Sequence, residues 1–126
     1  MQTQGLLTEI RDGNVVIVVF GTPLQQIEEV NVTEVGQKLV EITDRLTQPL
    51  LVLDMTATEF FGSSFIEVLF RVWKQLSLNP AAQLAIVGLQ PYCREVLKVT
   101  HLDTLWQIFD TQEEASKALN QGLATR

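Results

Sequence analysis

Two adjacent serines, Ser63 and Ser64, are the residues of this sequence whose position best suits chemistry. They follow an apolar run at 50–53 and a polar stretch, and they precede an apolar segment with helical periodicity. Ser64 and Glu67 fit the S/T-x-x-E capping box, so Ser64 is predicted to cap the helix. Ser63 then lies one residue outside the helix, where the amides of the first turn favour a phosphate. This hydroxyl is a candidate for phosphorylation, although serines that serve only as cap and turn residues show the same pattern.

The other reactive side chains offer little catalytic chemistry. Cys93 and His101 are the only cysteine and the only histidine, which excludes a metal cluster built from several residues of these types. Cys93 is expected in the core, and His101, which follows a predicted helix end, is expected at the surface. The sequence contains no G-x-x-x-x-G-K-S/T or G-x-G-x-x-G phosphate loop. We therefore expect neither enzymatic activity nor a bound cofactor.

The composition is that of a folded protein with no nucleic-acid partner. Hydrophobic residues make up 46% of the chain and charged residues 19%, and the length of 126 residues suits a single domain over 1–126 with its core at about 6–123. The formal net charge of -6 argues against binding to a phosphate backbone. The N-terminus lacks the layout of a signal peptide, and no apolar run reaches the length of a membrane span. Direct membrane insertion is therefore not expected, and the cytoplasm is the expected location.

The N-terminal third is predicted to form a β-hairpin followed by a helix. Apolar-rich runs at 6–11 and 15–20 flank Asp12-Gly13-Asn14, a sequence typical of a hairpin turn. Residues 24–30 show no clear period and are expected to form a loop. A helix is predicted to begin at Asn31, because apolar residues then recur at spacings of three and four, at Val32, Val35, Leu39, Ile42 and Leu46. Gly36 lowers the helix propensity of this segment and indicates close packing there.

The remaining sequence alternates strands and helices. The unbroken apolar run at 50–53 fits a strand buried on both faces in the middle of a sheet, and Asp54 at its end is expected to accept hydrogen bonds from loop amides. A helix from 64 to about 78, a strand at 84–87, a helix at 90–99, a strand at 106–109 and a helix capped by Thr111-x-x-Glu114 follow. The order ββαβαβαβα predicts an α/β fold with a mixed central sheet of about five strands and about four helices.

The helix predicted from residue 64 has a wider apolar arc than a surface helix needs. The arc spans about 200° of the helix circumference. One of its two edges is therefore expected at the surface as a docking strip, unless neighbouring helices cover both. One edge consists of Phe65, Val68 and Val72, and the other edge consists of Ile66, Phe70 and Trp73.

This order of elements, and above all the stretch LVLDMTATEFFGSSFIEVLF, resembles the STAS domains, the family named for sulphate transporters and anti-sigma factor antagonists. The likeness covers about residues 6–123. It depends on an apolar strand, a short loop and a serine pair before an apolar helix, with the motif positions held by Asp54, Met55, Thr56, Phe60, Gly62, Ser63 and Ser64. In bacterial antagonists of this family, a partner that is both anti-sigma factor and kinase phosphorylates the first serine of the pair. The resemblance places that role on Ser63.

The resemblance implies a protein-interaction module with a phosphorylation switch. The implied partner is an anti-sigma factor with serine kinase activity. It is expected to dock on a surface made of Asp54, Phe61, Gly62, Ser63, Ser64, Phe65, Glu67 and Val68. A phosphate on Ser63 adds about 1.5 to 2 negative charges beside Asp54, Glu59 and Glu67, and the repulsion opposes docking.

Departures from the family pattern favour a different use of the same fold, as a phosphorylation-independent scaffold or an accessory subunit of a membrane transporter. Gly62 stands where the family often has aspartate, and Gly21-Thr22-Pro23-Leu24 stands where it often has Gly-x-Leu-Asp. In this alternative, Phe61 and Phe65 are exposed and form a permanent interface. A third class, the receiver domain of two-component signalling, is disfavoured by the opening hairpin and by the absence of its acidic pair and lysine.

Overall fold

A five-stranded mixed sheet forms the centre of the computed structural model, which describes residues 5–124 and the side chains of residues 5–122. The strand order is β1-β2-β4-β6-β7. β1 (Leu7–Asp12) runs antiparallel to β2 (Val15–Phe20). β4 (Leu50–Asp54), β6 (Gln83–Val87) and β7 (Gln107–Phe109) continue the sheet in parallel with β2. The predicted α/β fold and mixed sheet are confirmed.

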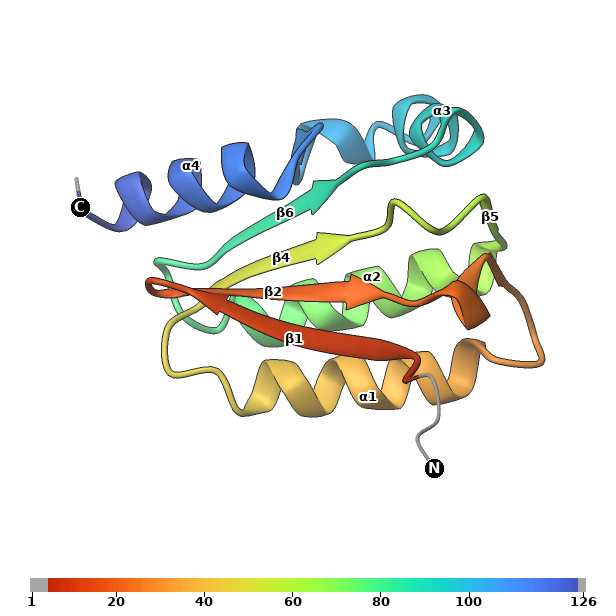
Figure 1. Cartoon of the computed structure of the whole chain (residues 1–126), viewed down its shortest axis with the longest axis horizontal. Helices are drawn as coiled ribbons and strands as arrows, with labels where there is room; N and C mark the ends of the chain where they lie inside the picture. Colours follow the sequence, from red (N-terminus) through yellow and green to blue (C-terminus); the bar gives the residue numbers. More distant parts are fainter. Residues whose placement is uncertain (1–4, 125–126) are drawn as a thin grey trace.

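Helices cover both faces of this sheet (Figure 1). α1 (Val32–Asp44) and α2 (Ser63–Leu76) lie side by side on one face, and α4 (Gln112–Ala124) lies on the other. α3 (Pro91–Val99) lies beyond the carboxyl end of β6. Two 3₁₀ turns, η1 (Thr22–Leu24) and η2 (Leu102–Thr104), complete the connections.

β4 is the central strand, as its unbroken apolar run predicted, and all five of its residues are buried. Successive side chains of a strand point to opposite faces of the sheet. Leu51 and Leu53 accordingly belong to the core beneath α1 and α2, and Leu50 and Val52 belong to the core beneath α4. Ala115 and Leu119 of α4 belong to that second core, and the side chain of Leu123, an apolar residue of the same predicted helix, lies outside the described residues.

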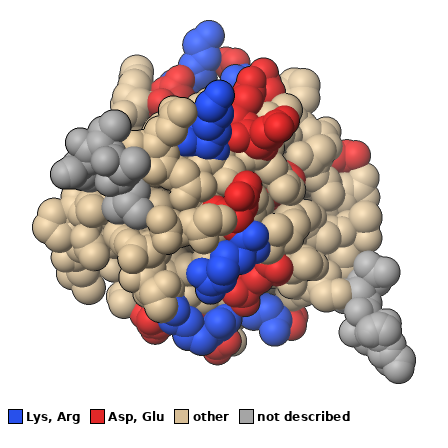
Figure 2. Space-filling model, turned by 60° about the vertical axis from the view of Figure 1, so that its left-hand side comes forward, with Lys and Arg blue, Asp and Glu red and all other residues tan. Residues whose placement is uncertain are grey.

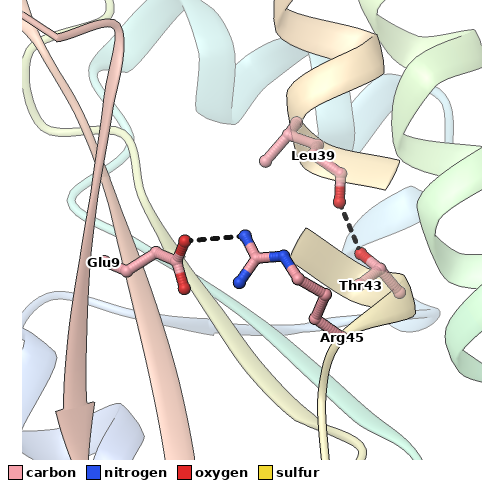
Figure 3. Close-up of polar contacts among 4 residues, drawn as sticks. All are labelled: Glu9, Leu39, Thr43 and Arg45. Carbon is pink, nitrogen blue, oxygen red and sulfur yellow. Dashed lines mark hydrogen bonds and ion pairs between the residues drawn. The ribbon is translucent and has the colours of Figure 1, made fainter. Parts of the chain in front are cut away.

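The N-terminal hairpin is confirmed and is fastened to helices on both sides. Gly13 adopts a φ of 64° in the turn, and the Asn14 amide donates to Oδ1 of Asn120 on α4 at 3.0 Å. On the other side of the sheet, Arg45, just after α1, forms an ion pair with Glu9 of β1 at 3.0 Å (Figure 3). Figure 3 also shows the Thr43 hydroxyl donating to the Leu39 carbonyl within α1.

α1 and α2 pack closely where the sequence placed a glycine in a helix. A Cβ on Gly36 would lie 3.1 Å from Cγ2 of Val68, so the predicted close packing at this position is confirmed. Of the two apolar edges of α2, the one with Phe65, Val68 and Val72 is buried, and the one with Ile66, Phe70 and Trp73 is partly exposed. The second edge is therefore the one that reaches the surface.

Charged side chains of both signs are interspersed on the surface. Figure 2 shows them as a mixed band across one face, without a patch of one sign. This distribution gives that face no extended positive surface for nucleic acid.

Candidate functional site

The loop that follows β4 is held by the carboxylate of Asp54. Its Oδ1 accepts hydrogen bonds from the Thr56 amide at 3.0 Å and the Thr56 hydroxyl at 2.6 Å. Its Oδ2 accepts one from Nε2 of Gln112 at 2.6 Å, so the loop is joined to the first residue of α4. Asp54 is only 9% exposed. The prediction that Asp54 accepts a loop amide is confirmed. These hydrogen bonds hold its carboxylate inside the protein, where a partner cannot contact it.

A second, two-stranded sheet then sets the position of the serines. β3 (Gln26–Ile27) pairs in parallel with β5 (Phe60–Phe61), inside segments that the sequence pattern had indicated as loops. The Gly62 amide donates to the Ile27 carbonyl at 3.1 Å, and the buried Thr58 hydroxyl donates to the Leu24 carbonyl at 2.9 Å. These contacts hold the chain extended as far as Gly62.

α2 begins earlier than the capping-box pattern predicted. Gly62 is the N-cap residue, with φ -89° and ψ 178°, and no side chain caps the helix. Ser63 and Ser64 are therefore the first two helical residues, and the prediction of Ser64 as the cap was wrong. The reason is the hydrogen bond between Gly62 and Ile27, because an N-cap residue must be extended and the pairing leaves Gly62 in that state.

Both serines are exposed at this uncapped helix end. The amides of Ser63 and Ser64 have no carbonyl one turn earlier in the helix to accept from them, because the helix has only begun there. The free amides and the helix dipole give the position a positive character that favours an anion by about 0.3–1 kcal/mol. The hydroxyl of Ser63 is thus accessible, and a phosphate carried on it would lie beside these amides.

Besides Asp54, three of the residues predicted to contact a partner are buried. Phe61 is 2% exposed, Phe65 is fully buried and Val68 is 4% exposed, so the expectation of exposed phenylalanines was wrong. The Phe65 ring packs against the rings of Phe20 and Phe61, with centroids 5.9 and 5.3 Å away. Phe65 lies four residues before Leu69 and seven before Val72, so it belongs to the buried stripe of α2. These side chains pack in the core beneath the two serines and are not accessible to a partner.

A hollow of about 340 Å³, here called the β3–α2 hollow, lies beside Ser63. Its lining residues are Ile27, Glu28, Glu29, Phe60, Gly62, Ser63 and Ser64. Glu28 and Glu29 are exposed and bring two carboxylates to it. The sequence analysis missed them, because only the pairing of β3 with β5 brings this part of the chain next to the serines.

A second hollow, of about 310 Å³, lies on the other side of Ser64 and is here called the α1–α2 hollow. Its lining residues are Val32, Thr33, Gln37, Ser64, Glu67, Val68 and Arg71. Glu67 is exposed, and Arg71 lies 3.7 Å from the position of a Cβ on Gly36. Ser64 lines both hollows, so the serine pair lies on the ridge between them.

An aromatic pair extends the surface beyond the β3–α2 hollow. Phe60 packs against Tyr92 of α3 with ring centroids 5.2 Å apart, and Tyr92 is 50% exposed. Val30, just beyond Glu28 and Glu29 in the chain, is 93% exposed. Aromatic residues are enriched at protein interfaces, which makes this pair suitable for contact with a partner.

The remaining reactive groups lie outside this surface. Cys93 is buried, and desolvation raises the pKa of its thiol to about 11, as suits the predicted core residue. His101 is exposed and adopts a left-handed φ of 63° after α3, as predicted for a surface residue at a helix end. Within residues 5–124, no group of three or more His, Cys, Asp and Glu is placed to hold a metal ion. The same part of the chain has no helix both long and apolar enough to cross a bilayer.

Known proteins share this architecture. An anti-sigma factor antagonist (STAS) domain protein from Planctomyces limnophilus is 32% identical, with a TM-score of 0.85 over 90% of this chain and 97% of that one. A Bacillus cell fate determinant, solved in its phosphorylated form, has 15% identity and a TM-score of 0.67 over 90% and 98% of the two chains. A sulfate transporter family protein from Wolinella succinogenes has 12% identity and a TM-score of 0.72 over 91% and 92%. The last two likenesses concern the fold alone.

The family model of the STAS domain matches residues 7–115, which include the sheet, α1 to α3 and the start of α4. The chain belongs to the STAS domain family.

Proposed function

We propose that this chain is a binding module of the anti-sigma factor antagonist type, switched by phosphorylation of Ser63. The partner is an anti-sigma factor with serine kinase activity, and the two proteins interact in the cytoplasm. The chain itself binds and does not catalyse. The observation that carries the proposal is the exposed Ser63 hydroxyl at the uncapped start of α2, on the ridge beside the β3–α2 hollow.

Phosphorylation changes the electrostatics of this ridge. A phosphoserine adds about 1.5 to 2 negative charges, and it would lie beside Glu28 and Glu29. The start of α2 offsets part of the repulsion, by about 0.3–1 kcal/mol. A doubly charged group among carboxylates is costly to desolvate in an interface, so the modified surface binds the partner more weakly.

The contact surface differs from the one expected from the sequence. Gly62, Ser63, Ser64 and Glu67 remain predicted contact residues, and the partly exposed Phe60 and the exposed Tyr92 join them as aromatic anchors. Asp54, Phe61, Phe65 and Val68 act from the interior by holding the ridge in place.

Incubation of the purified chain with serine-kinase anti-sigma factors and ATP, followed by mass spectrometry, tests the proposal. We expect one phosphate on Ser63, its loss in Ser63→Ala, and its retention in the matched control Ser64→Ala. The phosphorylated chain should release the partner in a pull-down assay. Phosphate on another residue, or a partner that stays bound in the presence of ATP without phosphorylating the chain, would contradict the switch.

A second candidate function is a scaffold or an accessory part of a membrane transporter, without a switch. The likeness in fold to the sulfate transporter family protein and the glycine at position 62 favour it. In that case Ser63→Glu, which imitates a phosphate, leaves partner binding unchanged. In the switch, the same substitution weakens binding at least tenfold, because the added charge lies beside Glu28 and Glu29.

A further inference from the structure

A cavity of about 580 Å³, larger than either hollow, lies away from the serines between α3, η2 and the edge strand β7. It shares no lining residue with the β3–α2 or the α1–α2 hollow. Its volume is in the range of small-molecule sites, which is roughly 300–1,000 Å³. We refer to it as the α3–β7 cavity.

One side of the α3–β7 cavity is apolar. Its apolar lining residues are Leu89, Leu97, Leu105, Trp106 and Ile108. Leu97 and Trp106 are 1% and 3% exposed, and the Trp106 ring is held by the ring of Phe70, with centroids 5.6 Å apart. The indole nitrogen of Trp106 is shielded from solvent and has no hydrogen-bond partner among the described residues. The apolar side suits a hydrocarbon or aromatic group.

The other side carries two cations on one turn of α3. Arg94 and Lys98 are four residues apart and line the cavity on either side of Leu97 in the sequence. Lys98 forms no ion pair with any residue of the described part of the chain. Arg94 pairs with Asp110 at 3.1 Å, but both side chains are more than half exposed. An exposed pair contributes at most about 1 kcal/mol, so Arg94 can also serve a ligand.

The charge of this lining is opposite in sign to that of the chain as a whole. Asp103 is the only acidic residue among the lining residues, against Arg94 and Lys98, although the net charge of the chain is -6. A guanidinium and an ammonium side by side match a carboxylate, because the guanidinium can donate two parallel hydrogen bonds to it.

We infer that the α3–β7 cavity binds a small organic carboxylate with an apolar body. The carboxylate lies between Arg94 and Lys98, and the apolar body lies against Leu97, Trp106 and Ile108. This assignment goes beyond the proposed function at Ser63, and its test needs neither a kinase nor a partner protein.

Titration of the full chain with octanoate tests this inference. Trp73 and Trp106 are the only tryptophans, so Trp73→Phe leaves Trp106 as a single reporter whose ring lines the cavity. We expect a saturable change in its emission. In the unsubstituted chain, NMR amide shifts should change at 94–98 and 103–108 and remain constant at 62–64.

Substitutions of the charged lining residues then test their contribution to octanoate binding. Lys98→Gln and Arg94→Gln should each weaken binding about fivefold, and Asp103→Asn should strengthen it about twofold, because exposed ion pairs contribute up to about 1 kcal/mol. Lys74→Gln on α2, an exposed lysine outside the cavity, is the matched control and should have no effect. Octanamide, of the same length without the charge, should bind at least fivefold more weakly.

Three results would overturn the inference: no saturable binding of octanoate, equal binding of octanamide, or unchanged affinity in both Lys98→Gln and Arg94→Gln. The first would mean that the cavity holds only water. The other two would mean that any binding there is not selective for a carboxylate.

Discussion

The starts of α2 and α4 carry the same capping-box pattern and have different structures. In α4, the Glu114 amide donates to the Thr111 hydroxyl at 3.2 Å, and Oε1 of Glu114 accepts from the Asp110 amide at 3.3 Å. In α2, the pattern at Ser64 and Glu67 makes no cap at all. The start of α4 is closed by the protein's own side chains, whereas the start of α2 is left open to solvent.

The difference shows how a long-range contact can override a local signal. Gly62 is held extended by Ile27, which is 35 positions away in the sequence, so the helix begins before Ser64 can cap it. The result is a helix end with free amides and two exposed hydroxyls. An end of this kind costs some stability and provides a place for an anion or a partner. The following predictions are ordered from the largest expected effect to the smallest.

The buried side chains beneath the start of α2 are predicted to contribute most to stability. Phe65→Ala should lower the free energy of unfolding by about 3–4 kcal/mol, because it removes a fully buried ring from the cluster with Phe20 and Phe61. Phe60→Ala, at the partly exposed surface, should lower it by less than about 1 kcal/mol. Urea unfolding followed by circular dichroism measures both. Equal losses would show that the open end does not rest on a buried core.

Asp54 links the loop that precedes the start of α2 to the start of α4. Asp54→Ala should lower the free energy of unfolding by about 2 kcal/mol, because the Thr56 amide and Nε2 of Gln112 lose a buried, charged acceptor. Asp44→Ala is the control, since Asp44 accepts from Gln75 but is exposed, and it should cost less than about 0.5 kcal/mol. A comparable loss for both variants in urea unfolding would refute the linking role.

The two capping-box residues provide the most direct comparison. Thr111→Ala should lower the free energy of unfolding by about 1 kcal/mol, since it removes the side-chain cap of α4. Ser64→Ala should change it by less than about 0.3 kcal/mol, because Ser64 caps nothing and alanine is a good helix former. Urea unfolding of the two variants in parallel measures both changes in the free energy of unfolding. A cost at Ser64 equal to that at Thr111 would mean that α2 is capped in solution.

The smallest expected effect comes from closing the open end. A Cβ at Gly62 would meet no atom within 4 Å, and its φ of -89° suits any residue. Gly62→Asp, which also restores the residue frequent in the family pattern, should therefore stabilise the protein by about 0.5 kcal/mol through capping and the helix dipole. Gly62→Ala is the control without a cap. Thermal unfolding in low salt measures the gain, and a loss of stability in Gly62→Asp would show that the space at Gly62 is needed.

Sequence patterns predicted the regular elements well, since these depend on local periodicity. The hairpin, the central position of β4, the segments of all four helices and the close packing at Gly36 follow from apolar spacing and turn residues. The exposure of Ser63 was also correctly predicted. Each of these features is encoded within about 20 neighbouring residues.

The details of the site were harder to predict, because they depend on contacts between distant segments. β3 and β5 have two residues each and leave no periodic signal. Without their pairing, Glu28 and Glu29 cannot be placed beside Ser63, and the first residue of α2 cannot be fixed. The burial of Phe61 depends on the same pairing, because Phe61 is a residue of β5 and lies opposite Ile27, and its ring packs against Phe65.

The pairing of β3 with β5 also determines what an enzyme acting on Ser63 can recognise. A synthetic peptide of residues 57–70 contains both serines but lacks Glu28, Glu29 and the carbonyl of Ile27 that holds Gly62 extended. Any kinase that recognises this surface therefore reads the three-dimensional shape of the finished protein rather than a linear motif. Under the switch proposed above, we therefore expect unfolded or partly synthesised copies to escape phosphorylation at Ser63.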